Sequence, residues 1–402
     1  MRILMLAHRI PYPPHTGDKT RAFHIARHLA RRHDLTLAFP VDDWADLGGL
    51  SALQDLGASL EYSRLWRPWS LLKGLGRLAL GGSVSLGYFG SRALERRVKR
   101  RGVEGPYDLV YVSSTPMAQY ARDFGVPVVM DFVDVDSDKW RQYAEHSRAP
   151  QSWLYRTEGR RLQAVEGDIA RWAGLSVLAT TAEETLLRSF APWARTAVIP
   201  NGIALDYYQP VEQVPGPPAV IFTGAMDYMP NVDAVQHFCG EILPRIRERI
   251  PDTRFYIVGL KPAAEVRRLA ETRGVVVTGT VPDVRPYYGR VGVCVAPLRI
   301  GRGVQNKVLQ SMAMGIPVVA SSVAQRGLEA VPGKHLYVED DPLAVAERVV
   351  SLLEAPVAGK FMGRQARAFV ESHHSWDASC SRLEAMLLAL AKSNPRLAGS
   401  PA

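Results

Sequence analysis

The 402-residue chain exceeds the usual size of a single hydrophobic core, so its length predicts two domains. With 47% hydrophobic and 22% charged residues it is typical of a globular protein, and its net charge of +9 favours acidic partners such as nucleotide phosphates, anionic lipids or nucleic acid. Its three cysteines are widely separated, which excludes a disulfide framework and a cysteine metal site and suits a reducing compartment.

Hydrophobic segments in this chain are all short. The apolar run before His8 is too short for an export signal, and no stretch of about 18 apolar residues is available to cross a bilayer. We therefore expect a cytoplasmic protein, with peripheral contact to the inner face of the membrane left open.

Short apolar runs typical of β-strands alternate with helical patterns along almost the whole chain. In the first half, the predicted strands are residues 3–7, 35–39, 60–64, 109–113, 126–131, 176–180 and 198–200. In the second half, they are residues 220–224, 255–259, 275–278, 293–297, 317–320 and 335–338. A first helix is predicted over residues 21–32, with Phe23, Ala26 and Leu29 on one face. This repeated order predicts an α/β fold of parallel sheets covered by helices on both faces.

The proline-rich stretch YQPVEQVPGPP, residues 208–218, has the composition of a linker. It divides the chain into a first domain over residues 1–207 and a second over residues 219–375. Residues 376–402 are expected to form a helix and tail that pack back toward the first domain. Because parallel sheets bind ligands beyond the carboxyl ends of their strands, two such domains facing a cleft place the chemistry in the strand-to-helix loops of both.

The loop after the first strand, HRIPYPPHTGDKTR, leads into the first predicted helix. Asp18, Lys19 and Arg21 surround the start of that helix, which puts charged groups at the predicted cleft. The alternative is a proline-stiffened loop whose polar residues only cap the helix. His8 is a candidate catalytic or acceptor-contacting group, although a loop histidine is commonly just solvated.

Residues 66–101 combine apolar bulk with positive charge. Trp66, Trp69 and several leucines come first, and six basic residues then accompany the single acidic residue Glu95 between Arg92 and Arg101. This pattern is compatible with contact to an anionic membrane surface. The alternative is a solvated helix face beside ordinary core. We expect no nucleic acid as a partner, because no recognition module accompanies the charge.

An acidic cluster directly follows a predicted strand of the first half. Asp131, Asp134, Asp136 and Asp138 fall within eight residues, at the end of the strand that faces the predicted cleft. Oxygen-rich clusters suit Mg²⁺, but the spacing matches no known loop for binding metal. We therefore favour recognition of acceptor hydroxyls by Asp131 and Asp134, or helix capping, over a metal site.

The segment VCVAPLRIGRGVQNKVLQSMAMGIPVVAS, residues 293–321, is the most informative. A strand ends near Pro297, a loop follows with Gly301 and Gly303 on either side of Arg302, and a helix is predicted over residues 306–314. Free amides and the positive end of the dipole at such a helix start bind phosphate, and the cations Arg302 and Lys307 lie there. A purely structural glycine turn is the alternative.

This segment resembles the donor-binding signature of the family 4 glycosyltransferases, which have the GT-B fold of two Rossmann-like domains. In that family a Gly-x-Gly turn leads to Lys-x-Leu-Glu-Ala-Met-Ala-x-Gly and then to Pro-Val-Val-Ala. The resemblance implies that Lys307 binds the donor diphosphate together with the amides of Gly303 and Val304. It places Gln310 where the family has the glutamate that binds the donor ribose.

Other segments extend the resemblance to both halves of the chain. The family's glycine-rich loop in the first domain corresponds to the loop with Gly17. In the second domain, Gly224 follows the first strand, and the loop with Gly279 and Val281 is implied to lie against the nucleobase. The bland alternative for that loop is a helix-starting turn with Asp283 as its N-cap.

The chain departs from the family pattern at its most polar positions. Gln310 lacks the charge-assisted bond of a carboxylate, and Arg302 stands where many members have a second acidic residue. The family's Arg and Lys pair after the first strand of the second domain is also missing, since residues 223–231 read TGAMDYMPN. The phosphate contacts therefore fall to Lys307, Arg302 and Arg299.

Three segments, HRIPYPPHTGDKTR, DFVDVDS and TGAMDYMPNVDAV, resemble one subfamily, the sugar transferases associated with the PEP-CTERM/exosortase system and bacterial exopolysaccharide clusters. The expected activity is retaining transfer of a hexosyl group from a nucleotide diphosphate sugar to a glycan or polyprenol-linked acceptor, without a cofactor or metal. Lys307, Arg302 and His8 are its candidate catalytic residues. The alternatives are a nucleotide-sugar epimerase of the same fold and a non-catalytic sugar-nucleotide-binding protein.

Overall fold

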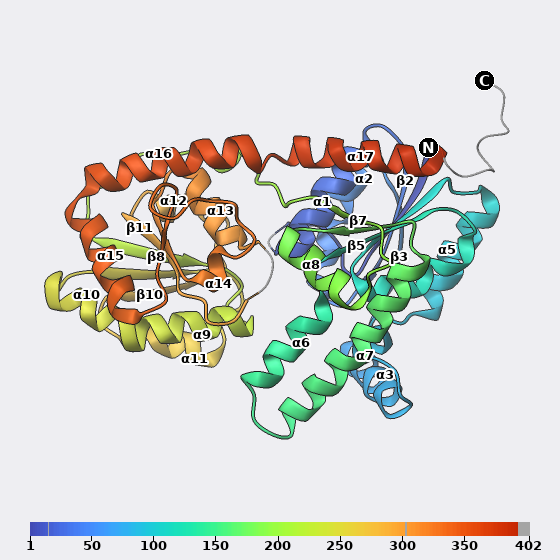
Figure 1. Cartoon of the computed structure of the whole chain (residues 1–402), viewed down its shortest axis with the longest axis horizontal. Helices are drawn as coiled ribbons and strands as arrows, with labels where there is room; N and C mark the ends of the chain where they lie inside the picture. Colours follow the sequence, from blue (N-terminus) through green and yellow to red (C-terminus); the bar gives the residue numbers. More distant parts are fainter. Residues whose placement is uncertain (15, 302–303, 393–402) are drawn as a thin grey trace. The chain divides into compact units, whose positions relative to one another are not determined.

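The computed structural model describes residues 1–14, 16–301 and 304–392. The chain forms two compact units, each with its own parallel sheet (Figure 1). The first unit contains Met1–Pro200 and the C-terminal helix from Asp377 onward, and the second contains Asn201–Trp376. The proline-rich stretch at residues 208–218 therefore belongs to the second unit.

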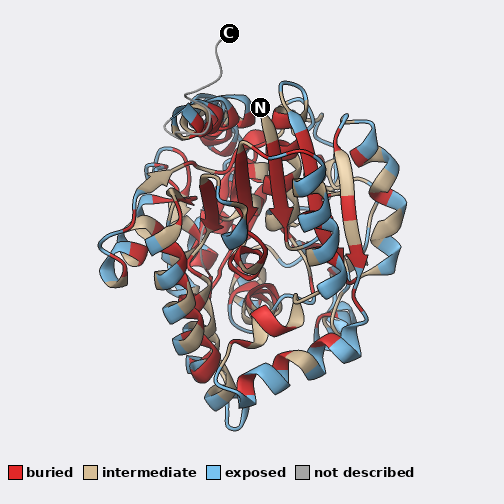
Figure 2. Ribbon diagram, turned by 90° about the vertical axis from the view of Figure 1, so that its right-hand side faces the viewer, coloured by how far each residue is buried: buried red, intermediate tan, exposed pale blue. Residues whose placement is uncertain are grey.

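The first unit is built on a sheet of seven parallel strands in the order β3-β2-β1-β4-β5-β6-β7. The strands are β1 (Arg2–Ala7), β2 (Asp34–Val41), β3 (Ser59–Arg64), β4 (Leu109–Ser113), β5 (Val128–Val133), β6 (Leu175–Leu178) and β7 (Thr196–Val198). Figure 2 shows buried strands in the middle of this sheet and helices with exposed outer faces around it, while the edge strands β3 and β7 are only partly buried. The strand order reverses between β1 and β4, and sheets of this kind bind ligands beyond the carboxyl ends of the strands at that point.

The second unit repeats this plan with six parallel strands in the order β10-β9-β8-β11-β12-β13. The strands are β8 (Ala219–Thr223), β9 (Arg254–Val258), β10 (Val275–Gly279), β11 (Val293–Ala296), β12 (Val318–Ala320) and β13 (Tyr337–Val338). Here the order reverses between β8 and β11, so the loops after these two strands are the expected ligand-binding edge.

Helices connect the strands of both units. In the first unit they are α1 (Gly17–Ala30), η1 (Trp44–Gly49), α2 (Leu50–Gln54), α3 (Arg67–Ala79), α4 (Val84–Tyr88), α5 (Arg92–Glu104), η2 (Thr115–Tyr120), η3 (Arg122–Phe124), α6 (Asp136–Glu145), α7 (Gln151–Trp172) and α8 (Thr181–Phe190). From the second unit onward they are α9 (Met229–His237), η4 (Phe238–Ile242), α10 (Leu243–Arg249), α11 (Ala264–Arg268), η5 (Leu269–Glu271), α12 (Arg285–Tyr288), α13 (Asn306–Ala313), α14 (Ser322–Gln325), α15 (Pro342–Glu354), α16 (Pro356–His373) and α17 (Trp376–Lys392). In the described parts of the chain, no helix is both long and apolar enough to cross a membrane.

The C-terminal helix α17 is tied to the first unit by one carboxylate. Glu384 accepts hydrogen bonds from His28, Arg32 and His33, at 2.8–3.0 Å. Burial works to raise the pKa of Glu384, but the bonds and charges of these partners outweigh it and hold that pKa below its usual range.

All thirteen strands predicted from the sequence are present, so the α/β class with two parallel sheets is confirmed. Their ends differ from the prediction by a few residues at most. Helix α1 begins at Gly17 rather than at residue 21, so the charged residues expected just before the helix lie in its first turns. A C-terminal helix is also present where one was expected, as α17.

Candidate functional site

The segment from β11 to β12 folds as the predicted strand, loop, helix and strand. Helix α13 begins at Asn306, and no side chain of its cap residue, Gln305, caps the first turn. Its end is set by Gly315, whose φ of +71° is the left-handed conformation that glycine adopts most easily. Amides at an uncapped helix start are free to meet an anion, and this start lies at the carboxyl edge of the sheet beside β8 and β11.

Lys307, in the first turn of α13, carries a buried ammonium group. Its side chain is 8% exposed, and its Nζ lies 3.1 Å from the Gln305 Oε1 and 5.1 Å from the centre of the Phe222 ring. Burial lowers the pKa of Lys307 to about 8. Across residues 1–14, 16–301 and 304–392, no carboxylate pairs with it. A buried cation without an anion is costly, so this position favours a negatively charged ligand.

Gln310 lies one turn beyond Lys307 on the same helix and is partly exposed. Its side chain lies beside the Tyr208 hydroxyl, and burial raises the pKa of that tyrosine. The Tyr208 carbonyl accepts a hydrogen bond of 3.1 Å from Arg367 on α16. The position predicted to bind the ribose is thus next to a tyrosine that was not expected from the sequence.

The loop before α13 contains the remaining predicted diphosphate ligands. Gly301 is buried, and a Cβ on it would lie 3.3 Å from Val323, while Val304 packs into the core. Arg302 and Gly303 lie outside the described residues. Arg299 forms an ion pair with Asp233 of α9, so its charge is already neutralised within the protein.

The loops after β8 and β9 press tightly together. A Cβ on Gly259 would lie 1.6 Å from the Gly224 carbonyl oxygen, and a Cβ on Gly224 would lie 2.7 Å from the Asn231 Nδ2. Asn231 is buried and donates to the Ala225 carbonyl at 2.9 Å, whereas its Oδ1 has no hydrogen-bond partner in the described part of the chain. A ligand hydroxyl could donate a hydrogen bond to a buried acceptor of this kind. No role for Asn231 was predicted from the sequence.

The loop after β10 contains the predicted nucleobase contacts. Gly279 has a φ of +67° and open space where a Cβ would stand, and Val281 is half-buried. The carboxylate of Asp283 accepts from the Arg285 amide at 2.9 Å and also pairs with its guanidinium at 2.8 Å. The alternative of Asp283 as the N-cap is not met, because the cap residue of α12 is Val284, although the Asp283 carboxylate does accept from an amide at the start of this helix.

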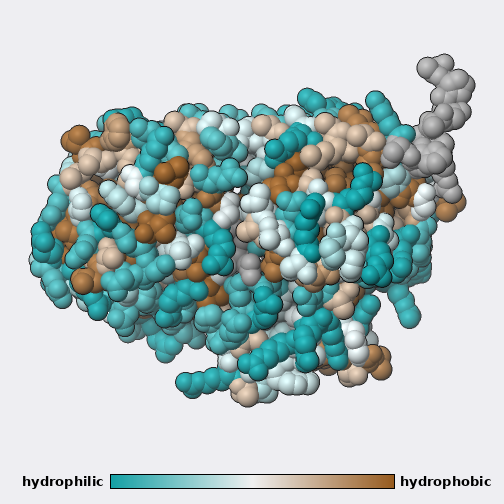
Figure 3. Space-filling model, in the orientation of Figure 1, coloured by the Kyte–Doolittle hydropathy of each residue, from teal (hydrophilic) through white to brown (hydrophobic). Residues whose placement is uncertain are grey.

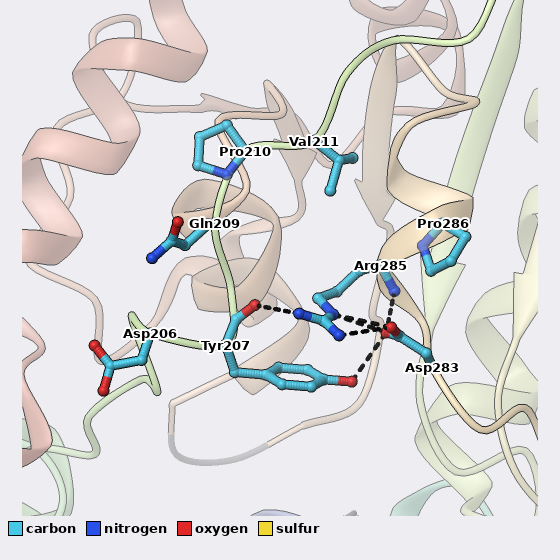
Figure 4. A pocket seen from close by; sticks show the side chains of 8 residues that line it. All are labelled: Asp206, Tyr207, Gln209, Pro210, Val211, Asp283, Arg285 and Pro286. Atoms are coloured by element: carbon cyan, nitrogen blue, oxygen red, sulfur yellow. Dashed lines mark hydrogen bonds and ion pairs between the residues drawn. The ribbon is translucent and has the colours of Figure 1, made fainter.

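A shallow pocket of about 260 Å³ lies beside this loop (Figure 4). The Arg285 guanidinium stacks 4.1 Å from the centre of the Tyr207 ring, and the Tyr207 hydroxyl donates to Asp283 at 3.0 Å. Hydrogen bonds from Arg285 come first among the causes that hold the pKa of Asp283 below its usual range. These three side chains pair their charges and hydrogen-bonding groups with one another, so this wall of the pocket is preformed.

In the first unit, His8 and Asp18 form a pair at the carboxyl end of β1. The His8 Nε2 lies 3.1 Å from the Asp18 carboxylate, and the His8 ring packs edge-on against Phe89. Burial works to raise the pKa of Asp18, but the hydrogen bond and charge of His8, with help from Arg9 and Thr16, hold that pKa well below its usual range. An ionised Asp18 orients the His8 ring.

Charged side chains surround this pair. Beside it, Arg9 and Arg67 each approach the buried Asp42 at 3.9 Å, and the Tyr88 hydroxyl donates to the same carboxylate at 3.2 Å. These residues follow β1 and β2 or belong to α3 and α4, so four elements contribute to one edge of the sheet. Asp42, Arg67 and Tyr88 were not expected from the sequence.

Of the other residues predicted beside the acceptor, two are completely buried. Arg21 and Asp131 form an ion pair with 0% exposure on both side chains, at 2.7 and 3.1 Å. Arg21 also donates to the Ile199 carbonyl at 2.9 Å, and the Tyr111 hydroxyl donates to Asp131. Their hydrogen-bonding groups are used inside the protein, so this pair holds α1, β4 and β5 together.

The remaining predicted residues stay near the surface. Gly17 is exposed at the start of α1, and Lys19 forms an ion pair of 2.6 Å with Asp46. Asp134 follows the end of β5 and contributes negative charge near Arg21. In the part of the chain that the structure describes, no group of three or more His, Cys, Asp or Glu residues is placed to hold a metal.

Two family models match the chain. Residues 16–202 match the glycosyl transferase 4-like domain, and residues 217–355 match the glycosyl transferases group 1. No curated protein matches the sequence.

Solved structures of the same fold are similar over nearly their full lengths. Sucrose-phosphate synthase from Thermosynechococcus elongatus is 16% identical with a TM-score of 0.74, over 97% of this chain and 99% of that chain. HepE from Anabaena, in complex with UDP-glucose, is 16% identical with a TM-score of 0.69, over 97% and 100%. WaaG, a glycosyltransferase involved in lipopolysaccharide biosynthesis, is 13% identical with a TM-score of 0.64, over 96% and 99%.

Proposed function

Because the chain belongs to the glycosyltransferases of the GT-B fold, we propose that it moves a sugar from a nucleotide diphosphate sugar to an acceptor hydroxyl, with retention at the anomeric carbon. The observation that carries the donor assignment is the buried ammonium of Lys307, which has no carboxylate partner in the described residues and lies at the uncapped start of α13. A diphosphate supplies the missing negative charge.

In the proposed reaction, the bond between the anomeric carbon and the diphosphate breaks as the acceptor oxygen bonds to the same carbon. Negative charge then develops on the departing diphosphate. The ammonium of Lys307 and the amides at the start of α13 are already fixed in place, so they stabilise this charge without rearranging. Arg302, outside the described residues, is proposed to add a second cation.

The polar groups around α13 are proposed to orient the donor. Gln310 binds a ribose hydroxyl from its position beside Tyr208, and the free Oδ1 of Asn231 accepts from a hydroxyl of the transferred sugar. The loop with Gly279 and Val281 is proposed to contact the nucleobase, because a glycine with open space above it admits a flat ring. UDP is the first nucleotide to test, since HepE was solved with UDP-glucose.

On the acceptor side, we assign the His8–Asp18 pair to the approach of the acceptor hydroxyl. An imidazole oriented by an ionised carboxylate can accept a proton from a hydroxyl. The acceptor is proposed to be a glycan or a polyprenol-linked sugar of bacterial exopolysaccharide or cell-envelope synthesis. The support for this pathway is the resemblance of the three segments described above to the exosortase-associated sugar transferases.

The test is incubation of the protein with radiolabelled UDP-sugars and a bacterial lipid extract. Movement of label into lipid or glycan supports transfer. A changed sugar without an acceptor would identify an epimerase, and donor binding without turnover would identify a non-catalytic binding protein. Stereochemistry follows from NMR of the product, where an inverted anomeric carbon would refute retention.

A further inference from the structure

Helix α3, Arg67–Ala79, buries two small residues and only one of its leucines, and most of its large apolar residues are exposed. Its buried positions are Ser70, Gly74 and Leu78, spaced four residues apart on one narrow face. The outward positions Trp69 and Leu72 are 57% and 59% exposed. An amphipathic helix of a globular protein normally has the opposite arrangement, with its bulk against the core.

The packing against α4 explains why the inner face must be small. A Cβ on Gly87 of α4 would lie 2.8 Å from the Gly74 Cα, and a Cβ on Gly74 would lie 3.0 Å from Val84. The two backbones are therefore in direct contact, and no leucine or tryptophan of α3 fits between them. The large side chains consequently project from the protein surface.

Large apolar side chains are exposed along α3 and at its two ends, and together they are called the α3 patch below. Its members, all at least 43% exposed, are Trp66, Trp69, Leu71, Leu72, Leu75 and Leu80. Six large apolar side chains on one short segment exceed the scattered exposure that is normal for a soluble surface. Figure 3 shows apolar atoms at the surface where Figure 1 places α3.

The segment that carries this patch has charge of a single sign. No Asp or Glu occurs between Leu65 and Leu94, a segment that contains Arg67, Lys73, Arg77 and Arg92. Arg67 lies beside Asp42 and Asp43, which precede the segment. Arg77 and Arg92 are exposed, and neither forms an ion pair with a described residue. Lys73 instead donates to the Gly90 carbonyl at 2.6 Å, which fixes α3 to the protein.

We propose that α3 is an interfacial helix that lays this patch on an anionic lipid bilayer. Tryptophan favours the boundary between lipid and water, leucines enter the acyl region, and arginines at the rim attract anionic head groups. The absence of acidic side chains from the segment removes the repulsion that such a surface would otherwise exert. The proposal goes beyond the proposed function, because it assigns a membrane-contacting surface to the full chain whether or not sugar transfer occurs.

The test is co-sedimentation of the full chain with vesicles, without donor or acceptor. Vesicles of phosphatidylcholine mixed with the anionic lipid phosphatidylglycerol are compared with vesicles of pure phosphatidylcholine. We expect clear binding to the anionic vesicles, weakened by salt, and at least about tenfold less binding for the triple variant Trp69→Ser, Leu72→Ser and Leu75→Ser.

A matched control removes the same amount of exposed apolar surface elsewhere. Leu343, Val357 and Phe361 in the second unit are 54%, 81% and 57% exposed, and their triple change to Ser should bind vesicles like the wild type. Equal loss in both variants would overturn the proposal. It would also be overturned if light scattering showed a dimer that the α3 variant dissociates and vesicles showed no binding, because a second copy would then cover the patch.

Discussion

The first unit buries the guanidinium of Arg21 against a carboxylate, whereas the second unit buries the ammonium of Lys307 with no carboxylate partner in the part of the chain that the structure describes. Each of the three guanidinium nitrogens of Arg21 donates a hydrogen bond, either to Asp131 or to the Ile199 carbonyl. Among the described residues, Lys307 has the Gln305 side-chain oxygen and the face of Phe222 as its polar and aromatic contacts. The first arrangement is complete within the protein, whereas we propose that a ligand completes the second. The predictions below test that contrast.

The largest effect is expected from breaking the complete pair. Arg21→Met leaves Asp131 buried and uncompensated, which should lower the free energy of unfolding by about 3–5 kcal/mol. Chemical denaturation measures the loss. Arg273→Met is the control, because its ion pair with Asp252 is 3.5 Å long and mostly exposed and should cost less than about 1 kcal/mol. Equal effects of the two changes would refute the structural role of Arg21.

Glu166 shows a third way to bury an ionisable group, which is to keep it protonated. Burial and the neighbouring Asp136 raise the pKa of Glu166 from 4.5 to about 8, while its Oε2 has no hydrogen-bond partner in the described residues. A raised pKa means that the folded state binds more protons, so this contribution to stability is complete below pH 4.5. The contribution then decreases by about 1.4 kcal/mol per pH unit as the pH rises from 4.5 toward about 8, the pKa of Glu166 in the folded state.

The measurement is the free energy of unfolding between pH 5 and pH 9, for the wild type and Glu166→Gln. Glutamine is uncharged at every pH, so the stability of the variant relative to the wild type should rise across this range. Parallel curves would contradict the assigned protonation state.

Removing the buried charge of Lys307 should weaken nucleotide binding without lowering the stability of the fold. Lys307→Met is expected to weaken UDP binding by about tenfold or more, as a charge-assisted contact contributes roughly 1.5–3 kcal/mol. Its stability without ligand should equal or exceed that of the wild type, because a buried unpaired charge is removed. Calorimetric titration and denaturation measure the two quantities, with Lys360→Met, at an exposed position, as the control.

The smallest effect is expected at Gln310, which contributes a neutral hydrogen bond. Gln310→Ala should weaken UDP binding by about two- to tenfold, corresponding to roughly 0.5–1.5 kcal/mol. Gln310→Glu should bind at least as tightly as the wild type, since a carboxylate makes a stronger bond to a hydroxyl. If alanine had no effect, Gln310 would not be a ribose contact.

The strands and the helix start at Lys307 could be predicted because each depends on local pattern. Buried parallel strands read as short apolar runs, and Gly315 marks the end of α13 through its left-handed conformation. Neither inference needs to know which segments meet in space.

The inward direction of Arg21 and Asp131 was not predicted, for two different reasons. Arg21 precedes Ile25 and Leu29 by four and eight residues, so the spacing does place it on the buried face of α1 once that helix begins at Gly17. Asp131 was expected at a strand end, but β5 continues to Val133 and keeps its side chain in the core. Asn231 packs against Gly224, which in turn contacts the distant Gly259, and no local pattern in the sequence reveals these contacts.

The most direct test of the account is the number of protons taken up when UDP binds at pH 8. Burial lowers the pKa of Lys307 to about 8, so at pH 8 roughly half of the molecules carry a neutral Lys307 amine. A bound diphosphate should restore the proton on this amine. Calorimetry in buffers of different ionisation enthalpy should therefore show uptake of about half a proton by the wild type and almost none by Lys307→Met. Equal proton uptake by both proteins, or UDP binding by the wild type without proton uptake, would contradict the proposal that Lys307 binds the donor diphosphate.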